Sequence, residues 1–132
     1  MKRVDAVFVA ILNANRNKVL LVNSNGGWGL PGGMREEGET LKQAGEREVM
    51  EETGVTVNLG TVGAVSERIK DGQHDLFVTF VTVPRENIDP KVTGDSEVSD
   101  IQWFSIEEAS AFMPWFPEGL QSVISSNAVY AV

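Results

Sequence analysis

The groups whose types and spacing could do chemistry are concentrated between Gly33 and Val55. Seven glutamates lie in this one loop-and-helix segment: Glu36, Glu37, Glu39, Glu46, Glu48, Glu51 and Glu52. On a helical wheel at roughly 100° per residue, Glu48, Glu51 and Glu52 fall in one sector. The same sector contains the residues of the first turns that would face a core, namely Leu41, Ala44 and Gly45. The carboxylates therefore continue the buried stripe of the predicted helix.

Two interpretations of these glutamates are open at this point. Acidic residues on a helix usually form its solvated face, and like charges at this spacing destabilise a helix by repulsion. A chain that keeps them on the buried stripe favours cations that neutralise them, and Mg²⁺ or Mn²⁺ prefers oxygen ligands. Arg47 lies one turn before Glu51 and either braces the carboxylates or forms an ordinary surface ion pair.

The bulk composition excludes several other kinds of site. The net charge of −8 argues against a protein that binds the nucleic-acid backbone, because such binding requires basic patches. It does not exclude anionic small molecules, since bound divalent cations invert the local charge of a site. The chain has no cysteine, so it has no disulfide, thiolate nucleophile or zinc–thiolate site. A length of 132 residues predicts one domain, residues 1–132.

No stretch of the sequence is typical of a membrane protein. The apolar run 6–12 follows Lys2 and Arg3, but it is short and lacks a cleavage site. We therefore interpret it as a buried strand and not as a signal peptide. No run is long enough to span a bilayer. We expect a soluble, cytoplasmic protein with no membrane partner.

The order of predicted elements places the acidic segment within an α/β fold. Strands are predicted over 4–12 and 18–22, paired as a hairpin, and over 55–59, 61–68, 74–83 and 101–104. The strand 74–83 is expected to be central because both of its faces are apolar, and it follows a hairpin turn at Asp71-Gly72. Helices are predicted over 40–53, from Ser105 onward and over 118–126. This order favours a mixed β-sheet with helices on both faces, an α/β/α sandwich.

The helix over 40–53 carries terminal signals at both ends. Thr40 and Gln43 have the spacing of a capping box, and Gly54 stands where a left-handed C-terminal cap is expected. Ser105 and Glu108 repeat the capping-box spacing at the next predicted helix. The long loop 84–99 between strands is acidic and contains two prolines, which is typical of a functional loop.

The acidic segment matches a known signature. That signature is Gly, five residues, Glu, seven residues, Arg-Glu, an aliphatic residue, any residue, Glu-Glu, any residue, Gly and an aliphatic residue. The matching positions are Gly33, Glu39, Arg47-Glu48-Val49, Glu51-Glu52, Gly54 and Val55. With no departure across 33–55, the chain resembles the Nudix hydrolases of MutT-like type. The lead-in from Trp28 to Gly33 and the order of elements extend the resemblance to most of the chain.

The resemblance implies a Nudix-type α/β/α sandwich whose loop–helix–loop holds Mg²⁺, or Mn²⁺ in its place. It implies Glu48 and Glu52 as principal metal ligands, Glu51 as a direct or water-mediated one, and the backbone carbonyl of Gly33 as a further one. Glu39 and Arg47 would support the geometry. The implied partner is a small nucleotide, a nucleoside diphosphate linked to another group, and dimers are common in the family.

The resemblance leaves the substrate and the function class open. Housecleaning hydrolysis of a nucleoside triphosphate is favoured by the short chain. Hydrolysis of ADP-ribose or a nucleotide sugar is an alternative. A non-catalytic nucleotide-sensing module on the same fold is an alternative of another class, which the intact set of glutamates disfavours.

The general base and the substrate contacts are also open. A carboxylate near the metal can deprotonate the attacking water, and in this family it belongs either to the signature helix, here Glu51 or Glu52, or to a later loop. The later candidates are Glu97 and, less favoured, Asp95. Candidate substrate contacts are Trp28, Arg35 and Arg68. Aromatic residues that either stack on a base or pack internally are Phe80, Trp103, Trp115 and Phe116. His74, the one histidine, has no partner for a zinc site.

Overall fold

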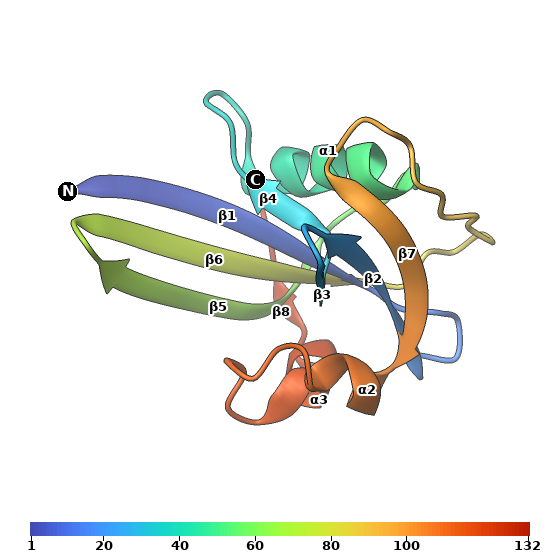
Figure 1. The fold of residues 1–132 in the computed structure, drawn as a ribbon. Helices are drawn as coiled ribbons and strands as arrows, with labels where there is room; N and C mark the ends of the chain where they lie inside the picture. Colours follow the sequence, from blue (N-terminus) through green and yellow to red (C-terminus); the bar gives the residue numbers. More distant parts are fainter.

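The strands of this protein form two sheets in a computed structural model that describes all residues, 1–132 (Figure 1). The five-stranded sheet has the order β4-β1-β6-β5-β8, and the three-stranded sheet has the order β3-β2-β7. The strands are β1 (Lys2–Ile11), β2 (Lys18–Ser24), β3 (Gly27–Gly29), β4 (Gly32–Met34), β5 (Thr61–Lys70), β6 (Gln73–Thr82), β7 (Val98–Ser105) and β8 (Ala128–Val129).

The strand β6 is the centre of the larger sheet. It runs parallel to β1 from Lys2↔Gln73 to Ile11↔Thr82 and antiparallel to β5. The sheet is therefore mixed, as the sequence predicted. The turn between β5 and β6 contains Asp71 at φ 51 and Gly72 at φ 75, left-handed at both positions. The predicted hairpin turn and the central position of this strand are confirmed.

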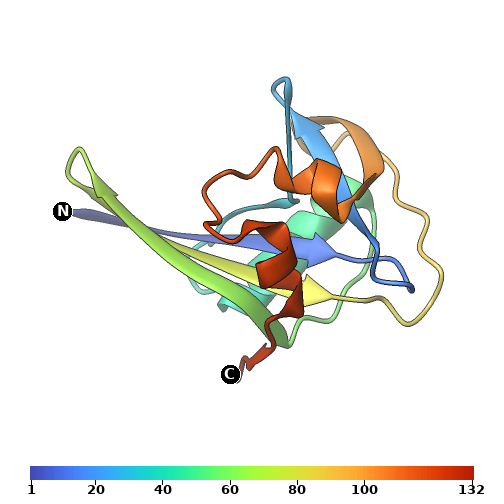
Figure 2. The same cartoon turned by 90° about the horizontal axis from the view of Figure 1, so that it is seen from below.

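Helices cover both faces of the larger sheet. On one face, Val7 and Val9 of β1 pack in a core with α1 (Leu41–Thr53). On the other face, Ala10 packs in a second core with α2 (Ile106–Ser110) and α3 (Gly119–Ser125). Figures 1 and 2 show α1 on one side of the strands and α2 and α3 on the opposite side. The α/β/α sandwich is confirmed, and its physical basis is that successive residues of β1 supply alternate cores.

The helix α1 is closed at both ends by the predicted caps. The Thr40 hydroxyl accepts from the Gln43 N–H at 3.1 Å, and the Gln43 side chain accepts from the Thr40 N–H at 2.9 Å. At the other end Gly54 is left-handed, at φ 71, and its N–H donates to the Met50 carbonyl at 2.9 Å. These caps satisfy terminal backbone groups and fix the rotation of the helix that carries Glu48 and Glu52.

The predicted hairpin between 4–12 and 18–22 is wrong. The strands β1 and β2 belong to different sheets and meet at a single bridge, Leu12↔Val19. Instead, β1 pairs along its whole length with β6, and β2 pairs with β7 from Lys18↔Ser105 to Ser24↔Val98. Because the second half of β1 and the middle of β2 are buried on both faces, each strand is stabilised more by long neighbours within a covered sheet than by a two-stranded ribbon.

The predicted strand over 55–59 is also wrong. Its residues alternate as in a strand, with Val55, Val57 and Leu59 buried. However, its backbone pairs with side chains of α1: the Leu59 N–H donates to Glu46 at 2.9 Å, and Lys42 donates to the Leu59 carbonyl at 2.9 Å. Glu46 is therefore held in this contact by Leu59 and Lys42 and is not a free surface acid. No helix in the structure combines the length and apolar character that crossing a membrane requires.

Close packing of α1 against β1 predicts a cost for Gly45→Ala. A Cβ at this position would lie 2.7 Å from Leu59 Cδ1 and 3.0 Å from Val7 Cγ1. Overpacking costs about 1–3 kcal/mol and outweighs the gain of up to ~1 kcal/mol in helix propensity. We expect urea denaturation to show a lower free energy of unfolding. Gly60→Ala is the control, because a methyl group added there would have no other atom within 4 Å; an equal loss in both variants would contradict the packing argument.

Candidate active site

Three of the predicted carboxylates line one pocket of about 470 Å³. Glu48 and Glu52 belong to α1, and Glu97 is the residue that precedes β7. The lining also includes Trp28, whose ring packs edge-on against Phe104 at 5.1 Å between centroids. The fold thus brings Glu97 to two acids that lie 45 or more positions before it in the sequence.

Glu52 is the buried member of this group, with only 6% of its surface exposed. The Gly32 N–H lies 3.3 Å from each of its carboxylate oxygens. Burial, the hydrogen bond with Glu48 and the charge of Glu48 together raise the pKa of Glu52 to about 9. In the absence of a cation, this carboxyl therefore carries a proton near neutral pH.

Glu48 lies against the backbone of β4. A Cβ on Gly33 would fall 2.6 Å from Glu48 Oε1, so a larger residue would displace this carboxylate from its position. Gly33 itself pairs with Val7 of β1, which sets its distance from the helix. This close approach is the physical reason for glycine at the first signature position.

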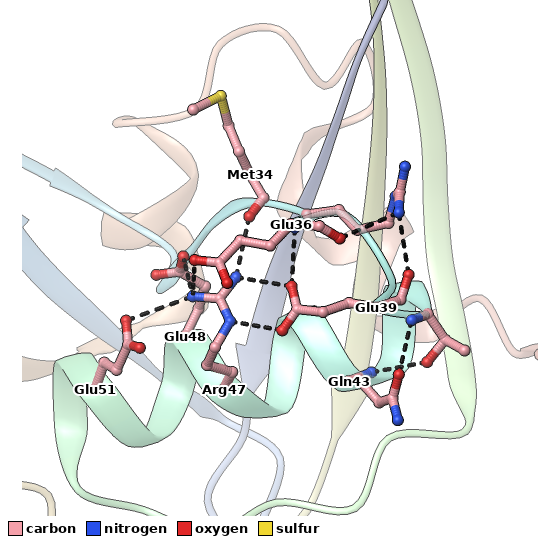
Figure 3. Close-up of polar contacts among 9 residues, drawn as sticks. Met34, Glu36, Glu39, Gln43, Arg47, Glu48 and Glu51 are labelled. Atoms are coloured by element: carbon pink, nitrogen blue, oxygen red, sulfur yellow. Dashed lines mark hydrogen bonds and ion pairs between the residues drawn. The ribbon is translucent and has the colours of Figure 1, made fainter.

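Arg47 connects α1 to the preceding loop (Figure 3). Its Nε and Nη2 donate to the two oxygens of Glu39 at 2.7 and 3.0 Å, and Nη2 also donates to the Met34 carbonyl at 3.1 Å. The hydrogen bonds with Arg47 hold the pKa of Glu39 below its usual range. The hydrogen bonds with Glu39 and Glu48 raise the pKa of Arg47 above the usual value of an arginine. This forked geometry is far more specific than a surface ion pair.

Glu51 stands apart from Glu48 and Glu52. Its side chain is 40% exposed, lies 3.5 Å from Arg47 Nη1 and does not line the pocket. No group of three or more acidic or histidine side chains in the structure has the spacing that holds a metal ion. The complete set of metal ligands therefore stays a prediction.

The chemistry of the pair Glu48 and Glu52 nevertheless fits a divalent cation. Glu52 is buried and Glu48 half-buried, and two carboxylates this close repel each other when both are ionised, which contributes to the raised pKa of Glu52. A cation bound between hard oxygen donors removes that repulsion. The donor set contains only oxygen, which suits Mg²⁺ or Mn²⁺ better than softer metals.

The predicted substrate contacts have different environments. Arg35 donates to the carbonyls of Glu36 and Glu39 at 3.2 and 3.1 Å and pairs with Asp5, so it pins the loop. Arg68 is held by Asp75 through Nε at 3.2 Å and Nη2 at 2.9 Å. Neither arginine lines the carboxylate pocket, whereas Trp28 does.

A second, more apolar pocket of about 580 Å³ adjoins the first. The two pockets share Phe8, Gly29 and Leu30. Its aromatic and charged lining includes Phe77, Arg68, Trp115 and Phe116. Sequence reasoning named Trp115 and Phe116 but missed Phe8 and Phe77, because apolar residues within buried strands carry no signal that separates pocket from core.

The other residues named from the sequence line neither pocket. Phe80 is fully buried and contacts Tyr130 edge-on at 5.0 Å between centroids. Trp103 packs against the core beside α1. His74 lies 2.7 Å from Glu67 on neighbouring strands. Asp95 is exposed, donates its N–H to Thr93 at 3.1 Å and lines neither pocket.

Comparison with known proteins agrees with this arrangement. The family model described as NUDIX domain matches residues 2–123. The chain belongs to the Nudix family. A Nudix fold accounts for the position of the glycine–glutamate loop, the capped helix and the two flanking layers.

Relatives of this Nudix chain differ in the substrates that their names describe. A Bacillus subtilis protein named as a candidate 8-oxo-dGTP diphosphatase is 34% identical over 83% of this chain and 71% of its own length. A mouse diphosphoinositol polyphosphate phosphohydrolase, 3-alpha, is 34% identical over 79% of this chain and 65% of its own. The structure of a MutT protein from Methanosarcina mazei Go1 is 25% identical, with a TM-score of 0.73 over 89% of this chain and 91% of that one.

The raised pKa of Glu52 predicts a pH-dependent stability of the metal-free protein. The carboxyl titrates near 4.5 in the unfolded chain and at about 9 in the folded chain. Between these values the folded state retains a proton that the unfolded chain has lost, so the free energy of unfolding falls as the pH rises through this window. We expect urea unfolding in EDTA to show this fall in the wild type and a smaller one in Glu52→Gln. Equal pH slopes in the two proteins would contradict the assignment.

Proposed function

We propose that this Nudix protein is a Mg²⁺-dependent pyrophosphohydrolase that cleaves a diphosphate linkage of a nucleoside triphosphate, in a housecleaning role. The observation that carries the proposal is the continuity of two pockets, one lined by Glu48 and Glu52 and the other by aromatic rings. With the diphosphate bound in the first pocket, an attached base would reach the second, where aromatic faces could stack on it.

The residues would divide the reaction as follows. Glu48 and Glu52 would hold the metal, with Glu51 contributing through water because it is more exposed. A bound divalent cation supplies charge neutralisation on the phosphate oxygens and stabilises the leaving group. Glu97 would accept a proton from water as the water oxygen bonds to phosphorus and the bond to the leaving oxygen breaks. Arg47 and Glu39 would keep the loop and helix in register.

The charges of the two pockets favour a nucleotide over an inositol pyrophosphate. An inositol polyphosphate carries many anionic groups and requires several cationic side chains around it. The carboxylate pocket has no lysine or arginine, and the aromatic pocket has Arg68 alone. A flat base with one diphosphate group matches this lining better. ADP-ribose or a nucleotide sugar is the alternative substrate, and a non-catalytic nucleotide sensor is the alternative function.

A substrate panel with Mg²⁺ or Mn²⁺ tests the proposal. It contains 8-oxo-dGTP, dGTP, ATP, UDP-glucose, ADP-ribose, diadenosine tetraphosphate and a diphosphoinositol polyphosphate, with products identified by mass spectrometry. We expect nucleoside triphosphates to be cleaved to the monophosphate and pyrophosphate, and Glu52→Gln to lower kcat by roughly a hundredfold or more. Glu37→Gln, at an exposed loop position, is the control and retains activity. Wild-type turnover by Glu52→Gln would exclude the metal assignment.

Substitution of Glu97 separates the two candidate positions of the general base. We expect Glu97→Gln to lower kcat by roughly a hundredfold, because the amide cannot accept the proton of the attacking water. The change should leave the thermal midpoint nearly unaltered, since Glu97 is exposed and precedes its strand. Glu86→Gln, an exposed acid of the same loop, is the control. Normal turnover by Glu97→Gln would return the role to Glu51 or Glu52.

A further inference from the structure

The carboxylate of Glu97 makes one side-chain contact, a hydrogen bond with Asn25. The amide nitrogen Nδ2 of Asn25 donates to Oε2 of Glu97 at 2.9 Å, across 72 positions in the sequence. Asn25 lies in the turn between β2 and β3, on the rim of the carboxylate pocket, whose lining includes Ser24 and Gly27. The contact therefore joins this hairpin to the residue that we propose as the general base.

The strand ladder places the two residues opposite each other. The antiparallel pairing of β2 and β7 ends at Ser24↔Val98, after a register shift between Asn23 and Ser24. Asn25 follows Ser24 and Glu97 precedes Val98, so both residues lie directly beyond the last pair of the ladder. The Ser99 hydroxyl also donates to the Asn23 carbonyl at 3.4 Å and holds the two segments together. Their meeting is a consequence of the sheet and not of a flexible loop.

The turn fixes the direction of the asparagine side chain. Asn25 is left-handed at φ 53 and Gly26 at φ 82, which is the pattern of a tight two-residue hairpin turn. Asparagine tolerates this conformation better than most residues with a side chain. A neutral amide donor at this position orients a carboxylate without neutralising its charge, whereas a lysine or arginine would pair with it electrostatically.

We propose that Asn25 is a positioning residue for Glu97. Its amide holds Oε2, which selects one orientation of the long glutamate side chain and leaves Oε1 to accept the proton of the attacking water. The inference rests on the proposed function, because it assigns Asn25 an effect only through the base. A general base must lie within hydrogen-bonding distance of the water that it deprotonates. A hydrogen bond to a neighbouring residue helps to hold the base in that position.

Two substitutions at Asn25 preserve the turn and remove the donor. Asn25→Gly keeps the left-handed backbone and deletes the side chain, and Asn25→Asp keeps the size but replaces the donor with a carboxylate. The matched control is Asp71→Gly in the turn between β5 and β6, where Asp71 is left-handed at φ 51 before Gly72. It makes the same change of backbone entropy, and its side chain has no contact with either pocket.

Hydrolysis of 8-oxo-dGTP with Mg²⁺ provides the measurement. We expect Asn25→Gly to lower kcat ~5-fold, the equivalent of one hydrogen bond, with KM and the thermal midpoint close to those of Asp71→Gly. Asn25→Asp should lower kcat further, because its charge repels Glu97. In the Glu97→Gln background, Asn25→Gly should have no additional effect, since the residue acts through that base.

The outcomes separate this inference from the proposed function. Wild-type kcat in Asn25→Gly, or a loss that adds fully to that of Glu97→Gln, overturns the positioning role while Glu97 keeps its own. A normal rate in Glu97→Gln overturns the base assignment, and the role of Asn25 falls with it. Absence of any wild-type hydrolysis across the nucleotides of the panel contradicts the proposed function itself. A lowered thermal midpoint in Asn25→Gly but not in Asp71→Gly would make Asn25 a structural residue.

Discussion

The forked contact between Arg47 and Glu39 is the interaction on which the geometry of the site depends. One guanidinium joins the loop carboxylate of Glu39, the backbone of Met34 and the helix carboxylate of Glu48. Because the fork is planar and fixed, the loop 34–39 and the helix α1 are held at one separation. That separation brings Gly33 against Glu48, where a side chain on residue 33 would displace the carboxylate. The positions of Gly33, Arg47 and Glu39 therefore depend on one another.

The glutamates of this segment have three separate physical roles. Glu39 is an anion that fixes an arginine, and Glu46 accepts from the backbone of Leu59 and so replaces a strand partner. Glu52 is buried beside Glu48, which makes its ionised form costly without a cation. Glu51 is more exposed, lies beside Arg47 and does not line the pocket. Only Glu52 among these glutamates is buried, and it is the one whose pKa the neighbouring Glu48 raises.

Two regions of the fold contribute different chemical groups to the proposed active site. The helix would supply the carboxylates that hold the proposed metal, while the residues at the end of the β2–β7 ladder are Glu97 and its hydrogen-bond partner Asn25. The pocket then continues through Phe8 and Leu30 to the aromatic pocket with Arg68. Rigid elements surround each part, as precise positioning of reacting groups requires. Substrate selection is therefore expected to depend on the aromatic end, and the reaction on the acidic end.

The sequence by itself determined the features that depend on local spacing. The capped helix α1, the inward position of Glu48 and Glu52 and the turn at Asp71-Gly72 were all predicted, because capping and helical periodicity involve residues only a few positions apart. Glu51 was expected on the same buried stripe, but its side chain is 40% exposed. Only the tertiary structure decided which strands pair, where Val55–Leu59 finds its backbone partners, and that Asn25 meets Glu97. Alternating apolar residues indicate that a strand is buried but not beside which neighbour, since many pairings bury the same faces. The pairing of distant strands is decided by the packing of the whole chain. The carboxylate pocket forms only when those strands and α1 have packed together.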